Sequence, residues 1–180
     1  MKPLSLKMRA IGLLSQREHS PLELRRKLLR IARDVQVRAR AAERSDPAGG
    51  DAGETRDDDE ISSEATAAEV DALLAWLQAQ GYLSESRFVE SRVHARAQRY
   101  GSLRIKQELA QHGLDLGAEQ QAALAVTEFE RAQAIWQRKF GNAPAQAAFD
   151  PALRARQTRF LAARGFSPGV IRRVLRAEDD

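Results

Sequence analysis

The sequence predicts an all-helical protein, and three observations carry this prediction. Ala, Leu, Arg, Glu and Gln dominate the 180 residues, and all five are strong helix formers. Signals that start and stop helices recur at short intervals along the chain. No stretch alternates polar and apolar residues with the two-residue period of a β-strand. We therefore expect a tandem array of three degenerate three-helix repeats, elongated and curved.

Helix starts are marked by capping residues, several of them followed by proline. At the clearest start Ser20 can cap the helix, Pro21 suits its first position, and Glu23 completes a capping box. The other starts are Asp150-Pro151, Ser167-Pro168, the box from Thr66 to Glu69, and the simpler cap Ser84.

Glycines mark the helix ends. A glycine can adopt the left-handed conformation that ends a helix at little cost. Three of the four glycines at such ends precede a large apolar residue, which can fold back onto the last turn. The four glycines are Gly81, Gly113, Gly141 and Gly165, and the apolar residues are Tyr82, Leu114 and Phe166.

These signals divide the chain into helices and repeats. The spacing of Leu22, Leu24 and Leu28 is matched by that of Leu103, Ile105 and Leu109, which indicates a degenerate repeat of about 50 residues. We expect the repeats to span residues 1–83, 84–127 and 128–180. The expected helices lie at about 4–16, 20–33, 66–80, 84–99, 102–112, 117–127, 128–140, 150–164 and 167–177.

The first repeat contains an acidic insertion at about residues 35–64. Between Asp34 and Glu64 there are ten acidic residues against four arginines, a net charge of −6. The segment has few large apolar residues, so burial cannot offset the entropy lost on ordering. We expect its centre to be a flexible loop, although its first part, to about Arg44, can extend the preceding helix.

The rest of the chain is strongly basic. Outside the insertion there are 25 basic and 15 acidic residues, a net charge of +10, against +4 for the whole chain. Such asymmetry indicates an anionic partner. Cysteine is absent, and no apolar run approaches the length of a membrane span. The N-terminus also lacks the pattern of a signal peptide, so we expect a cytoplasmic protein with no membrane partner.

No enzyme site can be assembled from the sequence. His19, His94 and His112 have no metal-ligand spacing, and there is neither a glycine-rich phosphate loop nor a nucleophile elbow. The run from Asp57 to Glu60 could hold a divalent cation only weakly, and a solvated acidic loop is the better interpretation. We expect no catalysis, no metal and no cofactor.

Stripes of basic residues are the stronger signal. Arg26, Arg30 and Arg33 form a first stripe, and Arg92, Arg96 and Arg99 form a second. Both have the spacing i, i+4 and i+7, which places residues on one helix face, and two matching stripes indicate a continuous basic surface. Guanidinium groups held on rigid helices suit phosphates and carboxylates. Tyr100 is the best candidate for base stacking, although packing is the favoured interpretation. The candidate binding residues are Arg26, Arg30, Arg33, Arg92, Arg96, Arg99, Arg104, Lys106, Arg172 and Arg176.

Many short motifs follow one another along the chain in a specific order and spacing. The N-terminal motifs are Glu18-His19-Ser20, Glu23-Leu24 and Lys27-Leu28. The central motifs are Gly81-Tyr82-Leu83, Arg87-Phe88, Tyr100-Gly101, Arg104-Ile105, Glu108-Leu109 and Gly113. The C-terminal motifs are Trp136, Arg138-Lys139-Phe140-Gly141, Arg159-Phe160-Leu161, Arg164-Gly165-Phe166-Ser167 and Ile171. Their order and spacing resemble those of the RecX family. One departure is the acidic insertion, which replaces a short glycine turn of the family's first repeat.

This resemblance implies tandem three-helix repeats and a regulator of the RecA recombinase. RecX-like proteins bind the RecA filament on single-stranded DNA. They inhibit its ATP hydrolysis, strand exchange and co-protease activity, and so modulate recombinational repair and the SOS response. The implied partners are therefore the RecA filament and the DNA within it, and we expect the protein itself to be a monomer.

Two other function classes remain open at this point. The first is a DNA- or RNA-binding protein that uses a helix-turn-helix-like module and acts independently of RecA. The second is an adaptor that binds an acidic protein and no nucleic acid.

Overall fold

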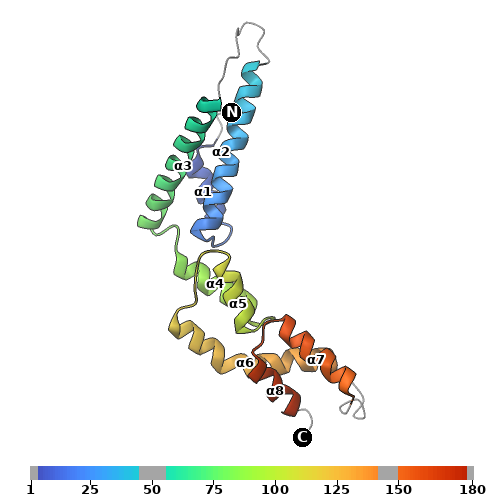
Figure 1. The fold of residues 1–180 in the computed structure, drawn as a ribbon. Coiled ribbons are helices and arrows are strands. Elements are labelled where there is room, and N and C mark those ends of the chain that lie inside the picture. Colours follow the sequence, from blue (N-terminus) through green and yellow to red (C-terminus); the bar gives the residue numbers. More distant parts are fainter. Residues whose placement is uncertain (1–3, 45–55, 142–149, 178–180) are drawn as a thin grey trace. The chain divides into compact units, whose positions relative to one another are not determined.

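The structure is a computed structural model that describes residues 4–44, 56–141 and 150–177. All regular structure in these residues is helical, as the sequence predicted (Figure 1). The chain divides into two compact units, Met1–Phe88 and Val89–Asp180, and each is described by itself. No helix in the described residues is long and apolar enough to cross a membrane.

Unit 1 is built on α1 (Leu6–Leu14), α2 (Pro21–Arg44) and α3 (Arg56–Ala79). The last two lie side by side along their lengths (Figure 1). Leucines at helical spacing face the interior, because burial of an apolar side chain contributes about 1.5–3 kcal/mol. The buried residues are Ala10, Leu24, Leu28, Val70, Leu74, Leu77 and Leu83.

Both helices of this pair are longer than the sequence predicted. The helix expected to start at about 66 begins at Arg56, and the one expected to end at about 33 continues to Arg44. The extension of α2 to Arg44 agrees with the helical first part that the sequence allowed, whereas the sequence did not predict the early start of α3; both helix ends lie within the expected insertion. Pairing of α2 with α3 stabilises these helix ends. For example, the Gln36 side chain donates to Thr66 Oγ1 at 2.9 Å. The centre of the insertion lies outside the described residues.

Unit 2 follows with α4 (Glu85–Ala97, which begins in unit 1), α5 (Ser102–Ala110), α6 (Ala118–Phe140), α7 (Pro151–Ala163) and α8 (Pro168–Ala177). Its main core gathers aromatic and aliphatic side chains from α6, α7, α8 and the turn between α7 and α8. These are Ala132, Ile135, Trp136, Phe140, Leu161, Phe166, Ile171 and Val174.

The two helices expected at 117–127 and 128–140 are one continuous helix, α6. No glycine or proline separates them, and Thr127 is accommodated because its hydroxyl donates to the Ala123 carbonyl at 3.4 Å. The described residues therefore form eight helices rather than nine. The proposed repeat boundary at 127/128 falls inside α6, so the limits of the repeats remain a prediction.

Three of the predicted glycine stops are confirmed, and they share one geometry. Gly81, Gly113 and Gly165 have φ of 72°, 72° and 78°. In each case the next residue donates its amide to a carbonyl five residues earlier, as from Phe166 to Leu161 at 3.3 Å. Gly141 also follows the end of a helix, α6, as predicted, but its φ is −60°, so its conformation is right-handed rather than left-handed.

A buried carboxylate joins the helices of unit 2. Glu128 accepts from the Ser102 amide at 2.9 Å and from the Ser167 hydroxyl at 3.3 Å. It therefore binds the first residue of α5 and the residue preceding α8. Two backbone bonds add to this junction, from Gly101 to the Arg164 carbonyl at 2.9 Å and from Leu103 to the Gly165 carbonyl at 3.1 Å. Such paired polar groups hold the ends of α4, α5 and α7 in fixed positions.

Candidate functional site

The first arginine stripe lies on the solvent side of α2. Arg26, Arg30 and Arg33 are all exposed, and their spacing puts them on one face of the helix. None forms an ion pair with another described residue. Their neighbour Arg25 differs, because it donates to both oxygens of Asp71 on α3 at 2.6 and 2.8 Å. The first stripe is thus available for an external partner.

Part of the second stripe lines a hollow between α4 and α5. Arg92 and Arg96 reach it from α4 and Arg104 from α5, and its volume is about 320 Å³. We name it the α4–α5 hollow. The other lining residues are Gln107, Glu108, Gln111 and His112.

One carboxylate, that of Glu108, contacts two of the three arginines in this hollow. Arg96 Nε donates to Glu108 Oε2 at 2.9 Å, and Arg104 Nε lies 3.8 Å from the other oxygen. Both guanidinium groups also flank the Tyr100 ring, with their central carbons 5.5 and 5.9 Å from its centroid. These contacts orient the arginines. Three arginines against one carboxylate leave the α4–α5 hollow positive.

Arg99 does not line the α4–α5 hollow with Arg92 and Arg96, although the sequence places all three on one stripe. It lines a different hollow, together with Arg138, Lys139 and Arg164. These last three residues belong to the motifs that resemble a family, but they were not among the predicted binding residues. Arg138 and Lys139 lie at the end of α6, and Arg164 directly follows α7. The order of these helices along the chain does not show that their ends come together.

The remaining candidates stand apart from both hollows. Lys106 is half-buried on α5, while Arg172 and Arg176 are exposed on the solvent side of α8. The opposite side of α8 buries Ile171 and Val174. A continuous basic surface that includes α2 remains a prediction, because the first stripe lies in the other unit.

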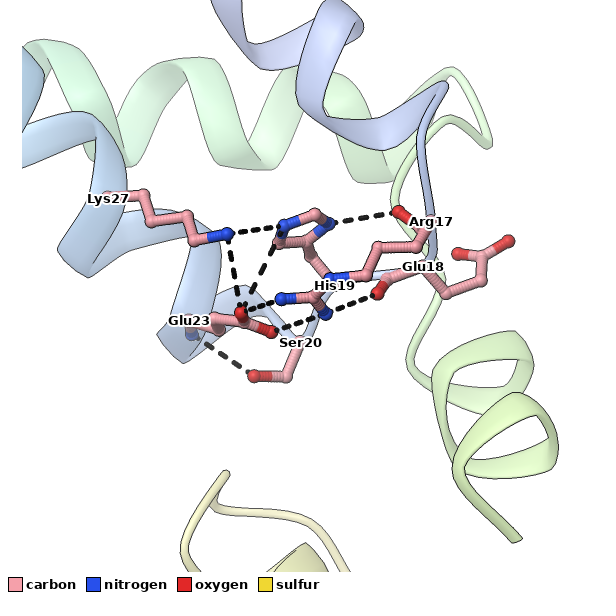
Figure 2. Close-up of polar contacts among 6 residues, drawn as sticks. All are labelled: Arg17, Glu18, His19, Ser20, Glu23 and Lys27. Atoms are coloured by element: carbon pink, nitrogen blue, oxygen red, sulfur yellow. Dashed lines mark hydrogen bonds and ion pairs between the residues drawn. The ribbon is translucent and has the colours of Figure 1, made fainter. Parts of the chain in front are cut away.

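His19 has a structural role at the start of α2 (Figure 2). It is 1 % exposed. Lys27 Nζ lies 3.0 Å from its Nε2, and its Nδ1 lies 2.9 Å from the Arg17 carbonyl oxygen. An ammonium can only donate, so Nε2 accepts, and Nδ1 carries the hydrogen that it donates to Arg17. Burial lowers the pKa of His19 below its ordinary value of 6.5, which keeps the ring neutral.

Glu23 completes this cluster (Figure 2). Its carboxylate accepts from Arg17, its backbone amide donates to Ser20 Oγ at 3.1 Å, and Lys27 Nζ lies 3.5 Å from a carboxylate oxygen. Burial alone would raise the pKa of Glu23, but the bond from Arg17 and the nearby positive charges lower it below 4.5. The predicted capping residues Ser20 and Glu23 therefore also organise a partly buried charge cluster around the buried His19 ring.

Acidic and histidine side chains do not gather into a metal site within the described part of the chain. The geometry of the basic residues instead suits an anionic ligand.

Two family models match the C-terminal half of the chain. One describes the second three-helix domain of RecX and matches residues 84–117. The other describes the third three-helix domain of RecX and matches residues 127–175.

Full-length relatives extend the similarity to nearly the whole chain. The regulatory protein RecX of Ralstonia nicotianae is 43 % identical over 180 residues, which cover 99 % of this chain and 91 % of the relative. The RecX protein of Herbaspirillum seropedicae is 40 % identical, with 99 % and 96 % covered. That of Pseudomonas entomophila is 36 % identical, with 98 % and 94 % covered.

Proposed function

This chain belongs to the RecX family of regulatory proteins, and we propose that it binds RecA filaments on single-stranded DNA. Binding inhibits ATP hydrolysis, strand exchange and co-protease function, and so modulates recombinational repair and the SOS response. The protein acts in the cytoplasm by binding, with no catalytic step of its own.

The observation that carries this proposal is the α4–α5 hollow. Three arginines from two helices converge there, and Glu108 and Tyr100 hold two of them in place. Pre-oriented guanidinium groups lose less conformational entropy when an anion binds. Acidic protein side chains and DNA phosphates both match this chemistry.

Charge alone is too weak to explain tight binding. An exposed ion pair contributes about 0.2–1 kcal/mol, so ten such cations would contribute at most about 10 kcal/mol, whereas nanomolar affinity requires about 12 kcal/mol. The protein therefore needs a second type of contact beside phosphate. A filament offers protein surface and DNA phosphate together, which favours it over free RecA or free DNA.

The direct test is RecA ATP hydrolysis on single-stranded DNA with rising amounts of this protein. We expect the rate to fall to a low plateau as the filament is occupied. An unchanged rate at amounts equal to RecA would contradict the proposal.

Direct binding to DNA without RecA is the second candidate function. The arginine stripe on α2, which has no ion pair within the described residues, favours it, because three exposed cations on one face suit a phosphate backbone. It predicts tight binding to duplex DNA with a sequence preference and no effect on RecA. Gel-shift titration of DNA alone at several salt concentrations separates the two functions.

A further inference from the structure

The ends of α4, α6 and α7 meet around a second hollow in unit 2, with a volume of about 140 Å³. We propose that this hollow, named the junction site, binds the backbone phosphates of a single-stranded nucleic acid. The proposal does not depend on RecA. The lining residues are Gln98, Arg99, Ile135, Arg138, Lys139, Phe160 and Arg164.

All charged residues of the junction site are positive. Arg99, Arg138 and Lys139 are exposed, and Arg164 is half-buried. None of the four has an ion pair with another described residue. The sequence of residues 142–149, which follows α6, also contains no acidic residue. In this respect the junction site differs from the α4–α5 hollow, where Glu108 already occupies two arginines.

A competing explanation is that these cations only neutralise helix ends. Each helix carboxyl end carries about −0.5 charge, so three ends carry about −1.5 against four full positive charges. Roughly +2.5 therefore remains for a ligand.

The exposed carbonyls at these ends also have other donors. Arg131 donates to the Ala97 and Tyr100 carbonyls, both at 2.8 Å. The Arg164 and Gly165 carbonyls accept the backbone amides of Gly101 and Leu103. Capping of these four carbonyls therefore does not require Arg99, Arg138 or Lys139. Their charge stays available to an external anion.

Arg164 is oriented in advance. Its guanidinium carbon lies 4.4 Å from the centroid of the Phe160 ring, and its Nη1 donates to the Arg99 carbonyl at 3.3 Å. The Phe160 ring in turn meets Phe140 edge to face at 5.3 Å. The Nε of Arg164 is buried and has no hydrogen-bond partner among the described residues. Stacking thus fixes the guanidinium plane, as binding of a phosphate requires.

The chemistry favours a phosphodiester chain over an acidic peptide. Successive phosphates of one strand bring charge at short, regular intervals, which matches four cations crowded around one small hollow. Ile135 and Phe160 add apolar surface beside the cations, and sugars and bases can cover such surface. An acidic peptide is the rival ligand, and the experiment below separates the two.

The test measures binding of fluorescein-labelled oligo(dT) by anisotropy, without RecA, at several salt concentrations. The variant Arg138→Gln/Lys139→Gln removes two exposed cations that form no ion pair or side-chain hydrogen bond with other described residues. We expect its affinity to fall about 10-fold at low salt. The slope of log affinity against log salt should fall by about 1.4, since each phosphate contact on a single strand contributes about 0.7.

The control variant is Arg38→Gln/Arg159→Gln, which removes the same charge from exposed positions outside both hollows. It should retain most of the affinity and salt slope. Equal losses in both variants would show that only net charge matters and would overturn the proposal. Wild-type binding by Arg138→Gln/Lys139→Gln, with circular dichroism confirming its fold, would also overturn it.

Competition identifies the ligand class. We expect unlabelled oligo(dT) to displace the probe from the wild-type protein far better than poly-glutamate of the same charge. Equal displacement would reject the phosphodiester assignment. Inhibition of RecA is tested separately. If the wild-type protein binds oligo(dT) through the junction site but does not inhibit RecA, this result contradicts only the proposed function.

Discussion

Gly101 and Gly165 approach so closely that a β-carbon on Gly101 would lie 2.2 Å from the Gly165 carbonyl oxygen. This distance is shorter than any van der Waals contact, and the atom approached is backbone. Neither segment can therefore yield without breaking the bonds that join the ends of α4, α5 and α7. The junction requires glycine at position 101 for lack of space, although the φ of this residue is −79°.

Gly101→Ala should lower the free energy of unfolding by about 1–3 kcal/mol, the usual cost of forcing extra atoms into a packed region. Urea unfolding followed by circular dichroism measures this. The matched control is Gly12→Ala in α1, where a β-carbon meets nothing within 4 Å. This control should gain about 0.5–1 kcal/mol, because alanine favours a helix. A neutral effect of Gly101→Ala would contradict the close approach.

Glu128→Ala should destabilise unit 2 more than Glu128→Gln. Alanine leaves the Ser102 amide without its acceptor, which costs about 1–3 kcal/mol. Glutamine keeps one acceptor oxygen and should lose less. Thermal unfolding of both variants checks the order, and equal losses would show that Glu128 acts by filling space rather than by accepting bonds.

Stability should decrease as the pH falls below about 6.5, because of His19. Its pKa in the folded protein is lower than the ordinary value, so the unfolded chain binds the proton more readily. The contribution is complete above about pH 6.5 and is lost as the pH falls towards the lower folded pKa. Urea unfolding at pH 7.5, 6.5 and 5.5 measures the loss.

The variant His19→Gln should show a smaller loss over this range, and the exposed His94→Gln should behave like the wild type. Glu23 acts at more acidic pH, since its lowered pKa gives stability that is present above 4.5 and is lost as the pH falls through its folded value. The same slope in His19→Gln and wild type between pH 7.5 and 5.5 would remove His19 from this explanation.

Glu108→Gln should strengthen anion binding. The carboxylate shares Arg96 and Arg104 in the α4–α5 hollow, and its removal releases both for a ligand. We expect inhibition of RecA at about two- to five-fold lower protein concentration in low salt, with a steeper salt dependence. Weaker inhibition by a folded Glu108→Gln variant would show that Glu108 is needed to position the arginines.

Local signals predicted much of the helical framework. Some helix ends depend only on residues within one turn of each other, so they can be recognised from the sequence alone. These are the starts at Ser20, Asp150 and Ser167 and the stop at Gly165. The cap proposed at Thr66 failed, because pairing of α2 with α3 extends the helix beyond it.

The binding surface was less predictable, because it depends on the positions of helix ends in space. Arg96 and Arg99 lie three residues apart on one expected stripe, yet they line different hollows. Arg138 and Arg164 meet through packing of α6 and α7, which no spacing along the chain reveals. The sharing of Glu108 between Arg96 and Arg104 likewise required the structure.

The central claim is that cations held at fixed positions on unit 2 bind the RecA filament. The most direct measurement is inhibition of RecA ATP hydrolysis by the triple variant Arg92→Gln/Arg96→Gln/Arg104→Gln beside the wild type, over a range of salt concentrations. We predict that the folded variant needs at least 10-fold more protein for half inhibition and that its inhibition depends less steeply on salt. Inhibition equal to the wild type at every salt concentration would contradict the claim.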